Sequence, residues 1–186
     1  MGTGNKNAIH ERAEDISGKT LGLIGCGNIA QEVIKIATIF NMKINCYTKN
    51  LDKYKKLDLC KNVNFMSLDE VLQSSDIINV SIPLNEKTKH MISREKINLI
   101  KTNSTFINTS RTEIVDNCAL MEYADKYNTF YVGLDIDIDN YKDLFSKKRN
   151  NVIITPHIAG TTKQAIDRMD IEIANKIVSL INKGGI

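Results

Sequence analysis

Short apolar runs alternate with segments of helical periodicity along the chain from Thr20 onward. Near-continuous apolar runs are typical of strands buried on both faces, and apolar residues that recur every three to four positions are typical of helices packed on one side. The predicted strands are Thr20–Gly25, Lys43–Thr48, Val63–Met66, Ile77–Ile82, Thr105–Asn108, Phe130–Ile136 and Val152–Thr155. The predicted helices are Ala8–Glu14, Asn28–Phe40, Leu68–Ser74, Ser93–Leu99, Asp116–Lys126 and Thr162–Ile181.

This alternation predicts an α/β fold, with a doubly wound parallel sheet between two layers of helices. Ligands bind such sheets beyond the carboxyl ends of the strands, where the strand order reverses. Polar and small residues follow several of the predicted strands, so residues far apart in sequence are expected to meet in one crevice. We expect residues 20–186 to form this domain. Residues 1–19 are expected to be an N-terminal segment, the remnant of a link to a missing domain.

The first predicted strand ends in Gly25-Cys26-Gly27-Asn28-Ile29-Ala30, and a helical segment follows at once. A G-x-G-x-x-A turn between a strand and a helix is the dinucleotide-binding turn of Rossmann-type sheets. Gly25 permits the tight turn, Gly27 lets the backbone approach a pyrophosphate, and Ala30 allows the helix to pack closely. The phosphates are expected at the helix N-terminus, where free N–H groups and the helix dipole favour an anion.

Composition excludes several classes of protein. The chain has 186 residues, enough for one domain with a full core, and its net charge of +3 does not suggest a nucleic-acid partner. No apolar stretch reaches membrane-spanning length, and no signal-peptide core is present. The four cysteines lack C-x-x-C spacing, so buried, reduced thiols in a cytoplasmic protein are expected, without a metal site.

The end of the second predicted strand bears on cofactor choice. In the NAD form of this fold an acidic residue at that point binds the adenosine ribose, and here the position is Thr48, followed by Lys49. No carboxylate stands there to repel a 2′-phosphate, and Lys49 supplies a positive charge. We therefore expect NADP(H) to bind at least as well as NAD(H).

Six further segments carry a family resemblance: Val80–Leu84 followed by Glu86–Ile92, Phe106–Arg111 with Val115-Asp116, Gly133–Asp135, and Ile154–Gly160. In this order they resemble the cofactor-binding domain of the D-isomer-specific 2-hydroxyacid dehydrogenases, over about residues 16–183. The resemblance implies hydride transfer between a nicotinamide and a small 2-oxo or 2-hydroxy acid. It also implies pairing of two chains through this domain, for which the last helix and Met121–Tyr127 are candidate contact segments.

The resemblance also assigns roles to residues. Arg111 would hold the substrate's carboxylate and carbonyl, for which a rigid guanidinium fork is suited, and His157 would be the acid/base, a role that suits imidazole near neutral pH. Asp135 would lie on the nicotinamide side of the cofactor. The expected cofactor-binding residues are Gly25, Gly27, Asn28, Ile29, Thr48, Lys49, Ile82, Pro83, Thr88, Thr109, Ser110, Arg111, Asp135, His157 and Gly160.

The chain departs from the family pattern at two positions. Asn140 stands where the family has the glutamate that pairs with the histidine, and an amide orients an imidazole without raising its pKa as a carboxylate does. Either the enzyme is slower and its activity is shifted toward acid, or Asp137 or Asp139 takes the partner's place. Thr112 stands where the family usually has glycine, which indicates a modest loop change.

Length is a third departure, because few residues precede the glycine turn and the substrate domain of the family is built mainly from that region. The chain is therefore expected to be a fragment, half of a two-chain enzyme, or a free-standing domain. Two functions remain open: the cofactor domain of a dehydrogenase, with Arg111, His157 and Asn140 in the catalytic positions, or a non-catalytic dinucleotide-binding module. A methyl-donor-binding transferase fits less well, since it has no use for Pro156-His157.

Overall fold

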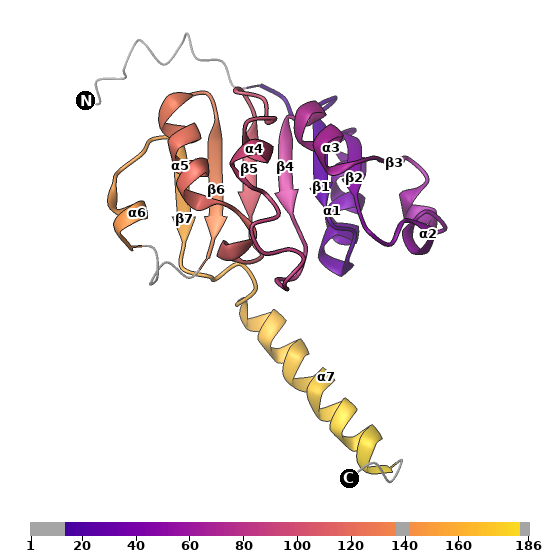
Figure 1. Ribbon diagram of the computed structural model, residues 1–186. Coiled ribbons are helices and arrows are strands. Elements are labelled where there is room, and N and C mark those ends of the chain that lie inside the picture. The colour runs from indigo at the N-terminus through magenta and orange to yellow at the C-terminus, as the bar shows by residue number, and fades with distance from the viewer. Residues whose placement is uncertain (1–13, 137–141, 183–186) are drawn as a thin grey trace, which may run out of the picture.

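The computed structural model describes residues 14–136 and 142–182, and within these the strands and helices alternate (Figure 1). The strands are β1 (Thr20–Ile24), β2 (Lys43–Tyr47), β3 (Val63–Phe65), β4 (Ile77–Val80), β5 (Thr105–Asn108), β6 (Tyr131–Asp135) and β7 (Val152–Thr155). The α-helices are α1 (Asn28–Ile39), α2 (Leu51–Tyr54), α3 (Leu68–Ser74), α4 (Arg94–Ile97), α5 (Asn117–Lys126), α6 (Lys142–Ser146) and α7 (Lys163–Asn182). Two short 3₁₀ helices are η2 (Asp58–Cys60) and η3 (Thr112–Ile114).

All seven strands pair in parallel in the order β3-β2-β1-β4-β5-β6-β7. The order reverses between β1 and β4, so their carboxyl ends flank the point where a doubly wound sheet binds ligands. The predicted fold class is therefore confirmed, as are all seven predicted strands. The predicted helix at Ala8–Glu14 lies almost wholly outside the described residues.

The core divides into two clusters, one on each face of the sheet. One joins α3, α4 and α5 to β4–β6 and includes Ile78, Phe106 and Leu120, all fully buried. The other joins α1 and η2 to β1–β3 and includes Leu23, Ile34 and Cys46. On the α1 side, Tyr131 of β6 and Ile153 of β7 are exposed, so this face is covered over β1–β3 but not at β6 and β7.

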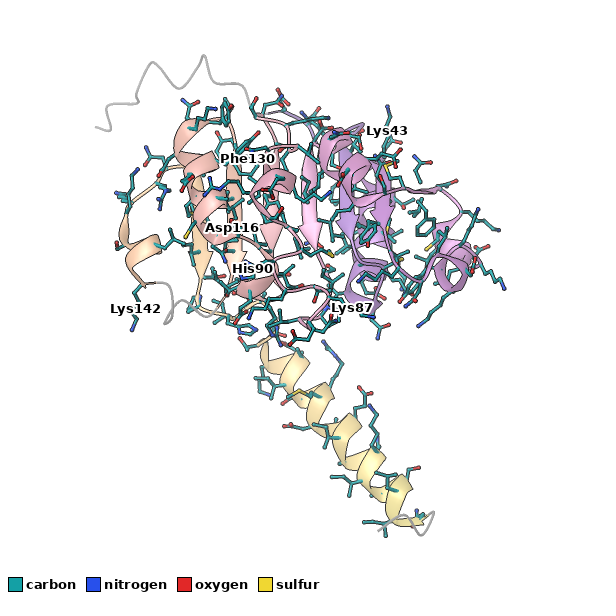
Figure 2. All side chains as sticks on the ribbon, in the orientation of Figure 1. Lys43, Lys87, His90, Asp116, Phe130 and Lys142 are labelled. Carbon is teal, nitrogen blue, oxygen red and sulfur yellow. The ribbon has the colours of Figure 1, made fainter. Side chains whose placement is uncertain are left out.

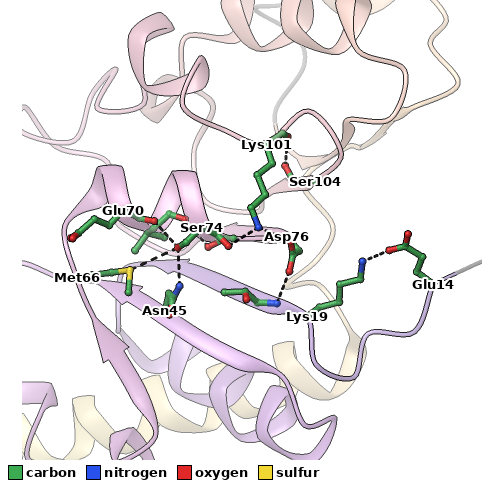
Figure 3. Close-up of polar contacts among 12 residues, drawn as sticks. Glu14, Lys19, Asn45, Met66, Glu70, Ser74, Asp76, Lys101 and Ser104 are labelled. Carbon is green, nitrogen blue, oxygen red and sulfur yellow. Dashed lines mark hydrogen bonds and ion pairs between the residues drawn. The ribbon is translucent and has the colours of Figure 1, made fainter.

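Polar residues at the amino-end edge of the sheet are joined to one another (Figure 3). The Asp76 carboxylate, just before β4, accepts hydrogen bonds from the Thr20 backbone N–H and from Lys101 Nζ, both at 2.8 Å. Nearby, Asn45 Nδ2 donates to Ser74 Oγ at 2.8 Å. Burial raises the pKa of Asp76, but the bonds from Lys101 and Thr20 outweigh it, so the pKa lies below its ordinary value. These contacts fix where β1 and β4 begin.

Two candidate contact segments differ sharply in exposure. In α5, Met121 and Tyr123 are buried, and the Tyr123 hydroxyl donates to the Ile100 carbonyl at 2.5 Å. The expectation that Met121–Tyr127 offers an apolar contact surface was therefore wrong, because its apolar side chains are used in the core. By contrast, α7 extends away from the sheet, and of its described side chains none is buried and all but that of Ala165 are exposed (Figure 1).

Candidate functional site

The glycine turn between β1 and α1 is built as the sequence predicts. Gly25 has φ +107°, and a Cβ there would lie 2.4 Å from the Ser81 carbonyl oxygen, so no other residue fits without displacing the backbone. A Cβ on Gly27 would meet no described atom within 4 Å. The space beside Gly27 is therefore open to a ligand, which is the arrangement that close approach of a pyrophosphate needs.

The N-terminus of α1 faces the same turn. Gly27 is the N-cap and offers no side chain to the first turn, and no acidic residue occurs in that turn. The Gln31 N–H donates to the Gly27 carbonyl, whereas none of the described residues accepts a hydrogen bond from the N–H of Asn28 or Ile29. These free donors and the helix dipole fit a phosphate group.

A cavity of about 380 Å³ opens beside this turn, between the ends of β1, β2 and β4. Its lining residues are Gly25, Cys26, Gly27, Tyr47, Thr48, Lys49, Asn50, Tyr54, Ser81, Ile82, Pro83, Asn85, Lys87, Thr88 and Met91. Seven of the expected cofactor-binding residues therefore share one cavity. Asn28 and Ile29 adjoin it at the start of α1 without lining it.

The loop after β4 is closed by the side chain of Thr88, which is buried. Its hydroxyl donates to the Pro83 carbonyl at 2.7 Å and accepts from the Asn85 N–H at 2.8 Å. This hydroxyl is thus occupied within the loop. Thr88 also lines the cavity, and its contact with the cofactor stays a prediction.

The residues after β5 lie beyond the cavity. Ser110 Oγ donates to the Val80 carbonyl at 2.9 Å, which ties this loop to β4, and the Ser110 N–H donates to Asn108 Oδ1. Arg111 is exposed, and one guanidinium nitrogen donates to the Ser110 carbonyl at 2.8 Å. The remaining guanidinium N–H groups have no partner among the described residues, so a bidentate face is available to a carboxylate.

Asp135, at the end of β6, holds the loop that carries His157. Its carboxylate accepts hydrogen bonds from Thr155 Oγ1 at 2.6 Å and from the N–H groups of Ile158 and Ala159 at 2.8 and 2.9 Å. Burial raises the pKa of Asp135, but these three bonds, with a smaller contribution from the positive form of His157, bring the pKa below its ordinary value. Asp135 is therefore an anionic anchor for the turn after β7.

His157 itself is exposed and has φ +52°, the left-handed conformation that non-glycine residues rarely adopt. Its N–H donates to the Thr155 carbonyl at 3.0 Å, and its imidazole has no hydrogen bond to the described residues. Such strained conformations persist where surrounding contacts impose them, which here are the bonds to Asp135 on either side of the turn.

Arg111 and His157 follow β5 and β7, which flank β6 in the sheet. Parallel strands are about 4.8 Å apart, so these two residues leave the sheet roughly 10 Å from each other at one edge. Thr109, Ser110, Asp135 and Gly160 lie along the same edge. Asn140 and its alternatives Asp137 and Asp139 lie outside the described residues, so the partner of His157 stays a prediction.

Three cysteines lie under the glycine turn. Cys26, Cys46 and Cys60 are buried and unpaired by disulfides, and Cys46 Sγ lies 3.6 Å from the Gly25 carbonyl oxygen. Burial is the largest cause that raises the pKa of all three thiols, that of Cys26 to about 11. They are therefore protonated at neutral pH and are not nucleophiles. Cys118 is exposed.

Lys87 is a lining residue that the sequence did not single out. It lies in a polar loop, and the position of its side chain at the cavity depends on how that loop closes. Elsewhere in the described part of the chain, no group of three or more His, Cys, Asp or Glu residues is placed to hold a metal ion. No helix among residues 14–136 and 142–182 is long and apolar enough to cross a membrane.

Comparison with known proteins gives a consistent result. The family model for the D-isomer specific 2-hydroxyacid dehydrogenase NAD binding domain matches residues 2–159. The hydroxypyruvate reductase of Thermotoga maritima is 37% identical over 170 residues, which cover 89% of this chain and 54% of that protein. The glyoxylate reductase of Pyrococcus horikoshii is 32% identical over 166 residues, covering 89% of this chain and 49% of that protein.

Solved structures agree with this result. An acyclic imino acid reductase in complex with NADPH and D-Arg matches with a TM-score of 0.81 at 30% identity, over 92% of this chain and 54% of that chain. D-lactate dehydrogenase with NAD⁺ from Lactobacillus jensenii matches with a TM-score of 0.79 at 28% identity, over 100% of this chain and 58% of that chain. The chain spans about half the length of the curated relatives that it matches.

The glycine turn, the open space beside Gly27 and the free N–H groups of α1 fit a dinucleotide, and the family model covers most of the chain. This chain belongs to the D-isomer-specific 2-hydroxyacid dehydrogenase family and contains its NAD-binding domain.

Proposed function

We propose that this protein transfers a hydride between NAD(P)H and a small 2-oxo acid, forming the 2-hydroxy acid. The observation that supports this most is that Arg111, Asp135 and His157 lie at the carboxyl-end edge of the sheet, the edge at which the cavity bordered by Gly25 and Gly27 also opens. Both Arg111 and His157 present side-chain groups that the described residues leave free. A protein that only binds a dinucleotide has no chemical need for either group.

Each residue then has a defined task. Arg111 holds the substrate's carboxylate through its guanidinium fork, which also fixes the carbonyl group beside it. A nicotinamide, when bound, would supply the hydride that the carbonyl carbon accepts. His157 donates a proton to the carbonyl oxygen, so that the product is a neutral hydroxyl group, and Asp135 keeps the turn of His157 in place. The residues that line the cavity would hold the adenosine and pyrophosphate half of the cofactor.

Turnover and binding are measured separately to test this proposal. The protein is mixed with NADPH or NADH and with glyoxylate, hydroxypyruvate or pyruvate, and the loss of reduced nicotinamide absorbance is followed. Replacement His157→Ala is expected to lower kcat roughly 10²- to 10⁴-fold. Dinucleotide affinity, measured by calorimetry, is expected to stay unchanged in this variant.

The possible outcomes separate the functions. Absence of affinity for both dinucleotides would overturn the proposal entirely. Tight binding without turnover, with any of the three acids, supports the alternative of a non-catalytic dinucleotide-binding module. That alternative is favoured by one observation, which is that Arg111 and His157 lie outside the cavity and are exposed.

We also propose that two copies of this domain pair in the cytoplasm through the outer face of α1. Ile29, Ile36 and Phe40 are 68%, 56% and 50% exposed, and with the partly buried Val33 they form one stripe along the helix. The intervals between these residues read the same from either end. A twofold axis between Val33 and Ile36 would therefore set Ile29 against Phe40, as an isologous contact requires.

Charges beside the stripe suit the same arrangement. Glu32 and Lys35 pair within α1, with Lys35 Nζ 2.7 Å from Glu32 Oε1. In an antiparallel pair of α1 helices each of these residues would face its opposite charge on the second copy. The three buried, reduced thiols agree with a cytoplasmic location.

Sedimentation of the protein with Ile36→Glu tests this pairing, and Ile153→Glu is the control because Ile153 is also exposed, on the open face of β7 (71%, against 56% for Ile36). The Ile36→Glu variant is expected to be monomeric, and the Ile153→Glu variant is expected to remain a dimer. A wild-type protein that is monomeric at all concentrations contradicts the proposal. Dissociation by variants of α7 instead would move the interface to that helix.

A further inference from the structure

The cavity carries lysines on two opposite walls. Lys49 follows β2, and Lys87 lies in the loop after β4, at the edge where the strands end (Figure 2). None of the described residues that line the cavity is acidic. The nearest carboxylates in sequence, Asp52 and Glu86, are not part of the lining. The cavity therefore presents net positive charge to whatever enters it.

Neither lysine is used to stabilise the fold. Among the described residues, no hydrogen bond or ion pair is made by the Nζ of Lys49 or Lys87. By contrast, Lys19, Lys96 and Lys101 each pair with a carboxylate at other places on the surface. Two lysines that share a cavity and lack partners are placed to bind an anion rather than to hold the chain together.

The backbone of Lys87 is held at its place in the wall. Its N–H donates to Asn85 Oδ1 at 2.9 Å, and Asn85 is in turn bound by Thr88 Oγ1. Thr88 is buried and also closes the loop on Pro83. The backbone that carries the Lys87 ammonium group is thus held in an ordered turn at the wall of the cavity.

The two dinucleotides differ at one group. NADP(H) carries a 2′-phosphate on its adenosine ribose, with a charge between about −1.5 and −2 at neutral pH, where NAD(H) has a neutral hydroxyl. The ribose subsite lies at the end of β2, next to Thr48 and Lys49. A second ammonium group on the facing wall adds attraction for the phosphate and nothing comparable for the hydroxyl.

We propose that Lys87 is a second determinant of cofactor choice, and that Lys49 and Lys87 hold the 2′-phosphate of NADP(H) from opposite walls of the cavity. This inference rests on the proposed function, because it takes the cavity to be the site of the adenosine half. The inference goes beyond the proposed function because it explains selection of NADP(H) over NAD(H). It assigns part of that selection to Lys87, which lies in the loop after β4 and outside the segment that follows β2.

Calorimetric titrations of four single variants test the inference. Lys87→Gln is compared with Lys89→Gln, since Lys89 lies in the same loop but does not line the cavity, and Lys49→Gln is compared with Lys53→Gln. The ligands are NADPH, NADH, adenosine 2′,5′-bisphosphate and AMP. The last two lack the nicotinamide, so their binding reports on the adenosine subsite without any turnover.

Lys49→Gln and Lys87→Gln are each expected to weaken NADPH and the bisphosphate roughly 5-fold at low salt, as suits solvent-exposed ion pairs. The double variant is expected to weaken them by more than about 20-fold, and affinity for NADH and AMP to change less than about 2-fold. The controls are expected to match the wild type, and NADPH affinity is expected to fall with salt more steeply than NADH affinity.

Three results would overturn the inference while leaving the proposed function intact. One is a wild-type protein that binds NADH more tightly than NADPH. Another is a Lys87→Gln variant that loses AMP affinity as much as bisphosphate affinity, which would place Lys87 on the pyrophosphate or the adenine. The third is an equal effect of Lys89→Gln. Failure of the wild type to bind any of the four ligands would instead contradict the proposed function itself.

Discussion

The two edges of the sheet carry similar polar residues but use them differently. At the amino-end edge, Asp76, Lys101 and Thr20 satisfy one another, and Asn45, in the middle of β2, is bound to Ser74 (Figure 3). At the carboxyl-end edge, the first N–H groups of α1 and the side chains of Lys49, Lys87 and Arg111 retain free donors. The difference lies in the side chains that the sequence places at each edge.

This contrast distinguishes residues that stabilise the fold from residues that are available to bind a ligand. Charged groups that already have partners contribute to stability, and charged groups without partners at a strand end mark a binding site. Asp135 is an exception within the second edge, since all three of its hydrogen bonds are internal. Its hydrogen bonds hold the turn that carries His157, so replacing Asp135 tests whether it supports the fold or the binding of a ligand.

The largest expected effect comes from Gly25→Ala. An alanine at φ +107° is strained, and its Cβ would also lie 2.4 Å from the Ser81 carbonyl oxygen. We therefore expect the free energy of unfolding, measured in urea, to fall by roughly 3–5 kcal/mol. Dinucleotide affinity should be lost with it. Gly160→Ala is the matched control, because a Cβ there meets no atom within 4 Å, and a change of more than about 0.5 kcal/mol would contradict this account.

Asp135→Asn is expected to have the next largest effect. An amide keeps one acceptor but turns a donor toward the N–H of Ile158 or Ala159, at a cost of roughly 2 kcal/mol in stability. We expect kcat to fall while the dissociation constant for the dinucleotide, measured by calorimetry, stays the same. Loss of dinucleotide affinity instead would show that Asp135 contacts the cofactor directly, as the family resemblance implies.

Asp76→Asn is expected to have the smallest effect, about 1–2 kcal/mol, because Asp76 is only partly buried. Its pKa is lower in the folded state than in the unfolded chain, so its contribution is present above about pH 4. That contribution is lost as the pH falls through the lower folded-state value. Urea unfolding of the variant should therefore vary less with pH below about pH 4 than unfolding of the wild type.

Asp76→Asn should change neither kcat nor the dissociation constant for the cofactor, since Asp76 lies at the opposite edge of the sheet from the cavity. A fall in affinity comparable to that of Gly25→Ala would show that the two edges are coupled. The division between structural and ligand-binding edges would then be wrong.

The sheet could be predicted from the sequence because its strands are continuous apolar runs with clear ends, as in Thr105–Asn108 and Val152–Thr155. The short elements α2, η2, η3 and α6 were not predicted, since they are too brief to show a helical period. The glycine turn was predicted because its residue types are dictated by backbone geometry.

Other parts of the site depend on contacts between distant segments. The bonds from Asp135 to the turn after β7 depend on the register that sets Asp135 beside Thr155, which no local pattern encodes. The place of Lys87 in the cavity wall depends on loop closure by Thr88. The assignment of Met121–Tyr127 to a contact surface failed because exposure cannot be read from an apolar segment alone.

The three buried thiols in and near the glycine turn allow opening of this part of the structure to be measured by their rate of labelling. A maleimide can reach Cys26, Cys46 or Cys60 only when the structure around them opens, whereas Cys118 is exposed and is labelled at once. The rate of the slow phase of labelling therefore reports how often this part of the structure opens. A dinucleotide that binds there lengthens the interval between openings, so occupancy can be read by mass spectrometry even when nothing is turned over.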